Sequence, residues 1–137
     1  MSLFVDTSAW YAAADADDDH HARATAVLGS GEPLHTTDHV LVETWLLLRY
    51  RLHRAAAERF WRAVRGGVAT LELVTHADLD AAFEVGVAWP DQDFSVVDRT
   101  SFAVMLRLGL RRVASFDDDF VVFRFGPGRR GAFQVVR

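Results

Sequence analysis

Two hydrophobic patterns run along this chain, short apolar runs and longer stretches with helical spacing. The short runs predict buried β-strands at residues 3–5, 34–36, 71–74, 113–115 and 133–136. The longer stretches predict helices at residues 8–14, 22–28, 38–51, 54–64, 77–87 and 95–108. Because the two kinds alternate, we expect an α/β fold: a three-layer α/β/α sandwich with a central parallel sheet of about five strands.

Local signals indicate where some of these helices begin and end. Ser8, Asp38 and Ser95 are candidate N-terminal caps, and Gly109 directly follows the last predicted helix. The sequence shows no internal repeat, no linker and no sign of a second domain, and a length of 137 residues suits one domain. We therefore expect residues 1–137 to form a single domain.

The amino-acid composition excludes several kinds of catalytic and metal site and indicates a cellular compartment. The chain has no cysteine, which excludes disulfides, thiolate zinc sites and cysteine nucleophiles, and it has no lysine for a Schiff base or a P-loop. No apolar run approaches the roughly 20 residues of a membrane span, and the N-terminus does not look like a signal peptide. We expect a cytoplasmic protein with no membrane partner. The formal net charge of −4 argues against non-specific nucleic-acid binding.

Four carboxylates stand at unusual positions. Asp6 and Asp117 each follow a predicted strand, and Asp98 lies three residues after Ser95 at a predicted helix start. Glu43 is the only carboxylate in a helical segment that is apolar nearly all round and so predicted to be buried. Each also has an ordinary structural explanation. Asp6 could form a turn or a helix cap, and Asp117 could belong to an exposed acidic turn. Asp98 could complete a capping box, and Glu43 could form an ion pair with an arginine.

Taken together, these positions predict one acidic site. Asp6, Asp98 and Asp117 are expected at the same edge of the sheet, Asp119 could reach the same cleft, and Asp118 should face solvent. Two carboxylates about 4 Å apart repel each other by about 4 kcal/mol at an effective dielectric of 20. Hard divalent cations relieve such repulsion, so we expect Mg²⁺ or Mn²⁺ and phosphoryl-transfer chemistry.

Five motifs then resemble, in order and spacing, those of the PIN-domain family, and in particular the VapC-type toxins of toxin–antitoxin pairs. They are LFVDTSAWYAA, DDDHHARA, VETWLLL, FSVVDRTSFAVMLRLGL and VASFDDDF. The resemblance implies a Mg²⁺-dependent endoribonuclease that cleaves RNA, with tRNA or rRNA as recurring targets, a cognate antitoxin and a homodimer. The implied catalytic and metal-binding quartet is Asp6, Glu43, Asp98 and Asp117, with Asp119 as a further metal ligand and Ser8 beside the metal ligands.

Other side chains could contact RNA or a protein partner. Arg49, Arg51 and Arg54 are candidate RNA-binding residues, although a solvated helix face is the alternative. Phe60 and Trp61 could belong to the core or line a groove for an antitoxin helix. The adjacent histidines at positions 20 and 21 lie in an acidic loop that could suggest a zinc site, but we expect them to be solvated on the surface.

Three rival functions remain open at this stage. A haloacid-dehalogenase-like phosphatase would use Asp6 as nucleophile, but Ser8 stands where that family has a second aspartate, and the usual lysine is missing. A phosphoacceptor receiver domain fails for similar reasons. A non-catalytic module could bind metal or partner arginines, and a PIN nuclease could act in RNA processing or on structured DNA instead of as a toxin.

Overall fold

A single sheet organises the fold, and the computed structural model describes it over all 137 residues. Its strands are β1 (Leu3–Val5), β2 (Leu34–Thr37), β3 (Thr70–Glu72), β4 (Arg112–Ala114) and β5 (Gln134–Val136). Every neighbouring pair is parallel, in the order β3-β2-β1-β4-β5. The predicted parallel sheet of five strands is confirmed.

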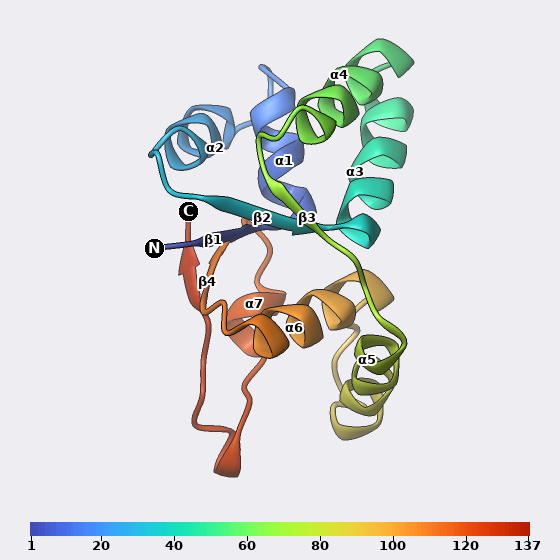
Figure 1. The fold of residues 1–137 in the computed structure, drawn as a ribbon, viewed down its shortest axis with the longest axis vertical. Helices are drawn as coiled ribbons and strands as arrows, with labels where there is room; N and C mark the ends of the chain where they lie inside the picture. Colours follow the sequence, from blue (N-terminus) through green and yellow to red (C-terminus); the bar gives the residue numbers. More distant parts are fainter.

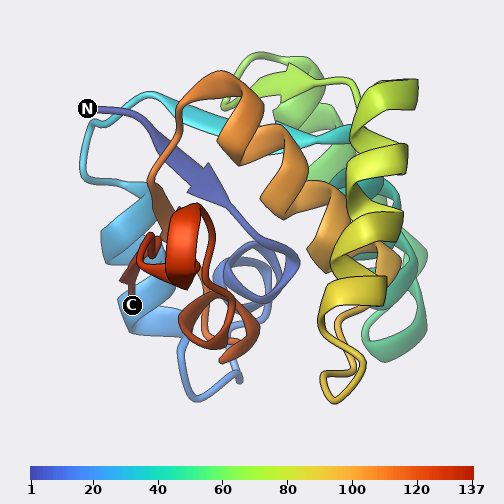
Figure 2. The same cartoon turned by 90° about the horizontal axis from the view of Figure 1, so that it is seen from below.

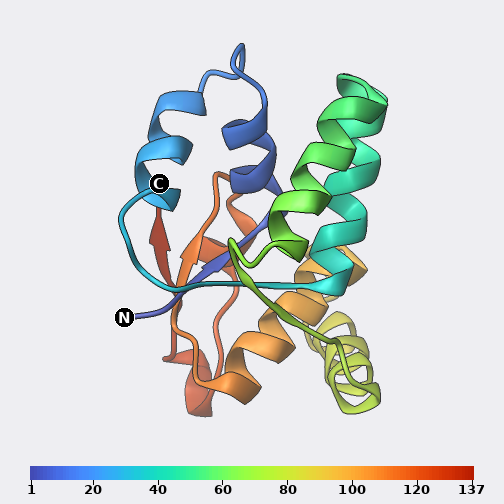
Figure 3. The ribbon, with the colours of Figure 1, turned by 45° about the horizontal axis from the view of Figure 1, so that its top comes forward.

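Helices cover both faces of the sheet, so the predicted three layers are confirmed as well. The helices are α1 (Thr7–Ala14), α2 (His21–Leu28), α3 (Asp38–Arg51), α4 (Arg54–Arg65), α5 (His76–Ala88), α6 (Val96–Leu108), α7 (Asp119–Val122) and the 3₁₀ turn η1 (Pro127–Arg129). Helices α1 to α4 lie on one face, and α5 to α7 lie on the other (Figures 1 and 3). None of these helices has the length and apolar character that crossing a bilayer would need.

The central strands and an aromatic cluster form the core. Phe4 of β1 and Val113 of β4 are fully enclosed. Beneath them, Phe102 of α6 stacks on Phe123 with ring centroids 4.2 Å apart and meets Phe120 edge-on at 5.0 Å. Burying one such side chain stabilises a fold by about 1.5–3 kcal/mol. This cluster therefore fixes the chain that follows β4, including the acidic run, against the sheet.

The strand order reverses at β1. The chain passes from β1 to β2 and β3 on one side, and later enters β4 and β5 on the other side, which Figure 2 shows from below. In parallel α/β sheets, ligands bind beyond the carboxyl ends of the strands at such a reversal. Asp6 follows β1 and Ser115 follows β4, so both lie at this point.

Two of the predicted helix caps are wrong. Helix α3 is capped by Thr37, whose hydroxyl accepts a bond from the Val40 amide at 3.0 Å. Asp38 is instead the first helical residue, and its carboxylate accepts a bond from the Val74 amide at 2.9 Å. Helix α1 begins one residue before Ser8, so that serine is free to turn toward the acidic residues. Asp38 and Ser8 thus each accept a hydrogen bond from a distant segment and do not cap the helix.

The cap predicted for α6 is confirmed. The Ser95 hydroxyl accepts a bond from the Asp98 amide at 3.0 Å, and the Asp98 carboxylate accepts one from the Ser95 amide at 3.0 Å. Gly109 ends the helix with φ of 71°, a conformation that costs glycine little. The short helix α7 was not predicted, because its four residues carry no helical period.

Helix α3 is not buried nearly all round, which corrects the prediction. Val42 and Leu46 are each 56% exposed, and Tyr50 is 86% exposed. One face of α3 packs into the layer, whereas the opposite apolar face is uncovered. Glu43 lies between these two faces and is half-buried.

Candidate active site

Five carboxylates from four separate segments gather at the carboxyl edge of the sheet. A pocket of about 300 Å³ is lined by Asp6 after β1, Glu43 of α3, Asp98 of α6 and Asp117 after β4. Oxygens of Asp98, Asp117 and Asp119 all lie within 4.8 Å of one another. The residues predicted to share a site are therefore brought together, although up to 113 positions separate them in the chain, from Asp6 to Asp119.

Asp6 is the most deeply buried of these carboxylates, at 3% exposed. Its Oδ2 accepts hydrogen bonds from the hydroxyls of Ser115 at 3.0 Å and Ser8 at 3.1 Å. Burial raises the pKa of Asp6 to about 7, and the charge of Asp98 adds to this rise. The two hydroxyl bonds favour the ionised form and offset only part of the effect.

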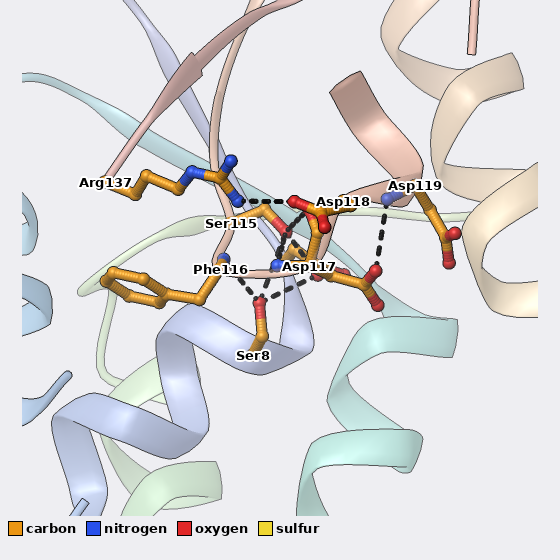
Figure 4. Close-up of polar contacts among 8 residues, drawn as sticks. Ser8, Ser115, Phe116, Asp117, Asp118, Asp119 and Arg137 are labelled. Atoms are coloured by element: carbon orange, nitrogen blue, oxygen red, sulfur yellow. Dashed lines mark hydrogen bonds and ion pairs between the residues drawn. The ribbon is translucent and has the colours of Figure 1, made fainter. Parts of the chain in front are cut away.

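Two serines connect Asp6 to the turn between β4 and α7. The Ser8 hydroxyl accepts a bond from the Phe116 amide at 2.9 Å, and the Ser115 hydroxyl accepts one from the Asp117 amide at 3.1 Å. Figure 4 shows Ser8 under this turn, with its hydroxyl directed at it. Ser8 thus supports Asp6 and the acidic turn, next to the predicted metal ligands.

The three consecutive aspartates point to different places, as the sequence indicated. Asp117 Oδ1 accepts a bond from the Asp119 amide at 3.1 Å, which closes the turn (Figure 4). Burial, then the hydrogen bond and charge of Asp98, then Asp117 raise the pKa of Asp119 to about 8. The Asp118 carboxylate is turned outward and accepts a bond from Arg137 at 3.1 Å. Only the first and third aspartates join the site.

Glu43 faces the pocket from α3. Burial raises its pKa, the nearby Thr7 hydroxyl opposes part of this rise, and the charges of Asp98 and Asp117 add to it. No arginine or histidine pairs with Glu43, so the ion-pair alternative does not describe this residue.

The residues of the pocket fit a divalent cation. No basic side chain forms an ion pair with any of the five carboxylates, so hydroxyl and amide hydrogen bonds offset only part of their mutual repulsion. The Oγ1 of Thr7, which also lines the pocket, is buried without a hydrogen-bond partner. All of these donors are oxygens, the ligands that hard divalent cations prefer. This acidic cluster therefore has the composition of a metal site.

Several lining residues were missed from the sequence. Tyr11 and Asp18 border the pocket, together with His20 and Phe116. His20 is exposed, as predicted, but its ring also stacks on Phe116 with centroids 4.4 Å apart, which was not predicted. Its neighbour His21 turns inward, with Nδ1 2.8 Å from the Ala12 carbonyl. A loop with no period gives no signal of such contacts.

The candidate RNA-binding arginines divide into two groups. Arg51, in the last turn of α3, lines the acidic pocket and lies over the Tyr11 ring at 5.2 Å. Arg49 is exposed outside the pocket, and Arg54 pairs with Glu58 at 3.2 Å. Only Arg51 is therefore placed beside the carboxylates.

The sequence matches the PIN domain over residues 3–126, which includes all five carboxylates. This chain belongs to the PIN-domain family. The family resemblance of the motifs is thus confirmed, and with it the expectation of a nuclease fold with an acidic centre that suits a divalent metal.

Two named relatives of this PIN domain are sequences of one protein. The 23S rRNA-specific endonuclease VapC20 from two strains of Mycobacterium tuberculosis, CDC 1551 and H37Rv, is 43% identical over 122 residues. The match covers 86% of this chain and 91% of each relative.

A solved structure agrees with this assignment. The crystal structure of Mycobacterium tuberculosis VapC20, described as a sarcin-ricin loop cleaving toxin, superposes with a TM-score of 0.84 and 38% identity. The superposition covers 90% of this chain and 96% of that one. Sequence and structure therefore lead to the same group of PIN-domain nucleases.

Proposed function

We propose that this PIN domain is a Mg²⁺-dependent endoribonuclease and the toxin of a toxin–antitoxin pair, with Mn²⁺ as an alternative ion. The observation that carries this proposal is the gathering of five carboxylates at one edge of the sheet, none of them in an ion pair with a basic side chain. Because the relatives are named for cleavage of 23S rRNA, we propose a ribosomal RNA loop as substrate in preference to tRNA. Such a protein acts in the cytoplasm.

The residues of the pocket would share the work of hydrolysis. Asp98, Asp117 and Asp119 form the tight group that would hold the ion, and Asp6 completes it from β1. When bound, a divalent cation would supply positive charge at the phosphodiester and would lower the pKa of a water molecule, which favours hydrolysis. Glu43, whose pKa is raised, is suited to accept a proton from that water.

Hydroxyl groups and one arginine would position these groups and the substrate. Ser8 and Ser115 fix the Oδ2 of Asp6 and the turn that carries Asp117. Arg51 is the only arginine that lines the pocket, and its guanidinium can contact a phosphate of the RNA. It provides a local positive charge in a protein of net charge −4.

A cognate antitoxin has a groove to occupy between α3 and α4. Leu41, Val42, Trp45, Leu46 and Trp61 line an entirely apolar cavity of about 190 Å³. Phe60 is in the core, but Trp61 is 48% exposed at this groove. An amphipathic helix of the antitoxin would bury these rings.

A homodimer would cover the adjoining apolar surface, which shares Val42 and Leu46 with this groove. His39, Val42, Leu46, Tyr50 and Val97 are among the residues around a cavity of about 580 Å³ on the outer side of α3. Monomeric proteins rarely leave large contiguous apolar patches exposed. We propose that a second copy of the chain packs here.

The direct test is cleavage of RNA by the purified protein. An end-labelled RNA hairpin with the sarcin-ricin loop sequence should be cut once in the loop with Mg²⁺, and EDTA should stop the reaction. Hydrolysis of p-nitrophenyl phosphate without RNA cleavage would instead support the phosphatase. Metal binding with neither activity would leave the non-catalytic module as the better description.

The gene neighbourhood tests the toxin role separately. A small adjacent upstream gene for a DNA-binding protein with a disordered tail would support a toxin. An isolated gene whose product still cleaves RNA would favour a PIN nuclease of RNA processing.

A further inference from the structure

The mouth of the acidic pocket has an aromatic stack that the hydrolytic chemistry does not use. The imidazole of His20 lies parallel to the Phe116 ring, with an interplanar angle of 9° and centroids 4.4 Å apart. Both residues line the pocket that holds Asp6 and Asp117. The stack is therefore part of the surface that a substrate must meet.

Phe116 is held rigidly with respect to the carboxylates. It lies between Ser115, which donates to Asp6, and Asp117, and its amide donates to the Ser8 hydroxyl at 2.9 Å. Its ring packs against the hydrophobic core. Its backbone is thus tied to the same two serines whose hydroxyls donate to Asp6.

His20 is fixed at the other side of the stack and yet exposed. Its amide donates to the Asp18 carboxylate at 2.8 Å, and it precedes the first residue of α2. One face of its ring covers Phe116, while the residue as a whole remains exposed. An exposed, pre-oriented aromatic face beside a phosphodiester site has the properties of a base-stacking platform.

We propose that His20, backed by Phe116, is a substrate-positioning residue on which an unpaired base next to the scissile phosphate stacks. This inference rests on the proposed ribonuclease function and specifies its substrate class: RNA whose bases are accessible in a loop or bulge. Bases in a duplex are stacked on each other and cannot reach such a platform.

Substitutions at position 20 separate stacking from other roles. His20→Ala should raise KM for the sarcin-ricin loop hairpin by about 5- to 100-fold, the range expected for loss of one base–aromatic stack. His20→Phe should restore KM to within a few-fold of wild type, because it keeps a flat ring. His76→Ala is the matched control, since that side chain is 91% exposed on α5, outside the pocket.

A spectroscopic measurement detects the stack itself. The hairpin with 2-aminopurine in its loop is titrated with the Asp98→Asn protein, which should not cleave it. We expect quenching of the 2-aminopurine fluorescence at one or more loop positions, retained in the His20→Phe double variant and lost in the His20→Ala double variant. Unchanged melting temperatures will show that the exposed substitution does not unfold the protein.

Several results would overturn the proposal. Wild-type KM and quenching in His20→Ala would exclude a platform, and so would a fall in kcat alone. Equal losses in His20→Ala and His20→Phe would indicate a specific hydrogen bond instead of stacking. If the wild-type protein cleaves no RNA with Mg²⁺, the proposed function itself fails, which is a different outcome from cleavage that ignores position 20.

Discussion

Asp98 lies where a helix cap and the acidic pocket meet. Its carboxylate accepts a hydrogen bond from the Ser95 amide. The same carboxylate lies close to those of Asp117 and Asp119. The two roles support each other, because a helix N-terminus favours an ionised carboxylate and a metal ligand must be ionised. In the absence of metal, however, the same charge repels its neighbours and raises the pKa of Asp6.

Asp98→Asn should therefore separate the two roles. Without metal, we expect this variant to melt at or above the wild-type temperature, because repulsion is relieved and the amide oxygen can still accept the Ser95 bond. Mg²⁺ or Mn²⁺ should raise the melting temperature of wild type but not that of the variant, by differential scanning fluorimetry. Asp91→Asn, in an exposed loop, is the control. A metal-free loss of several degrees would show that capping dominates.

The raised pKa values predict how the metal-free protein responds to pH. Asp6 and Asp119 bind protons in the folded state up to pH about 7 and about 8, whereas the unfolded chain releases them near pH 3.8. Their protonation thus favours the folded state, and this stability is lost as pH rises from about 4 to 8. The slope from each group is at most about 1.4 kcal/mol per pH unit.

Urea unfolding in EDTA at several pH values measures this effect. The free energy of unfolding should fall between pH 5 and pH 8, and substitution of Asp6 by Asn should flatten the curve. If the free energy of unfolding instead rises with pH over this interval, burial does not raise the pKa of Asp6 as described.

At the scale of elements, α5 and α6 are joined by an ion pair far from the pocket. Asp78 accepts bonds from Arg107 Nε at 3.0 Å and Nη2 at 2.9 Å, and the Asp78 side chain is only 4% exposed. Asp78 also completes the capping box of α5 with Thr75. Burial by itself would raise the pKa of Asp78. The hydrogen bonds from Arg107 and Thr75 and the charge of Arg107 outweigh this effect, so the pKa lies below its usual value.

Asp78→Ala should cost about 2–4 kcal/mol of unfolding free energy, since it removes a cap and leaves a charged partner without its carboxylate. Asp80→Ala on the same helix removes a 74% exposed carboxylate and should cost less than about 0.5 kcal/mol. Chemical denaturation measures both. If both substitutions lower the free energy of unfolding by the same amount, the Asp78–Arg107 ion pair contributes no more to stability than an exposed surface charge does.

At the scale of the whole molecule, the layer arrangement leaves apolar surface on the outside of α3. Tyr50 is 86% exposed beside the largest cavity, and Leu46 is 56% exposed. That cavity and the acidic pocket share Glu43 and Leu47 in their linings. A second copy packed on this surface would therefore border the site.

Tyr50→Asp should convert a dimer into a monomer, because it would place a charge in the apolar interface. Light scattering coupled to size-exclusion chromatography measures the mass. Leu108→Asp, at the far end of α6, should remain dimeric. A monomeric wild-type protein would show that a different partner covers this surface.

The sequence by itself determined the layered α/β fold, the capping box of α6 and the identity of the acidic residues. Periodicity reports burial along one element, and strands followed by carboxylates indicate which edge of a parallel sheet is charged. Asp6 and Asp117 could be assigned in this way. The spacing of the motifs also sufficed to indicate the PIN-domain family, which the comparisons confirm.

Only the tertiary structure decided which side chains meet. The stacking of His20 on Phe116, the exposed face of α3 and the use of Ser8 and Ser115 to hold Asp6 all depend on contacts between distant segments. Such contacts leave no periodic trace in the residues that make them. The same holds for the helix caps. Asp38 was predicted to cap α3, but its carboxylate accepts a hydrogen bond from the amide of Val74, which follows β3.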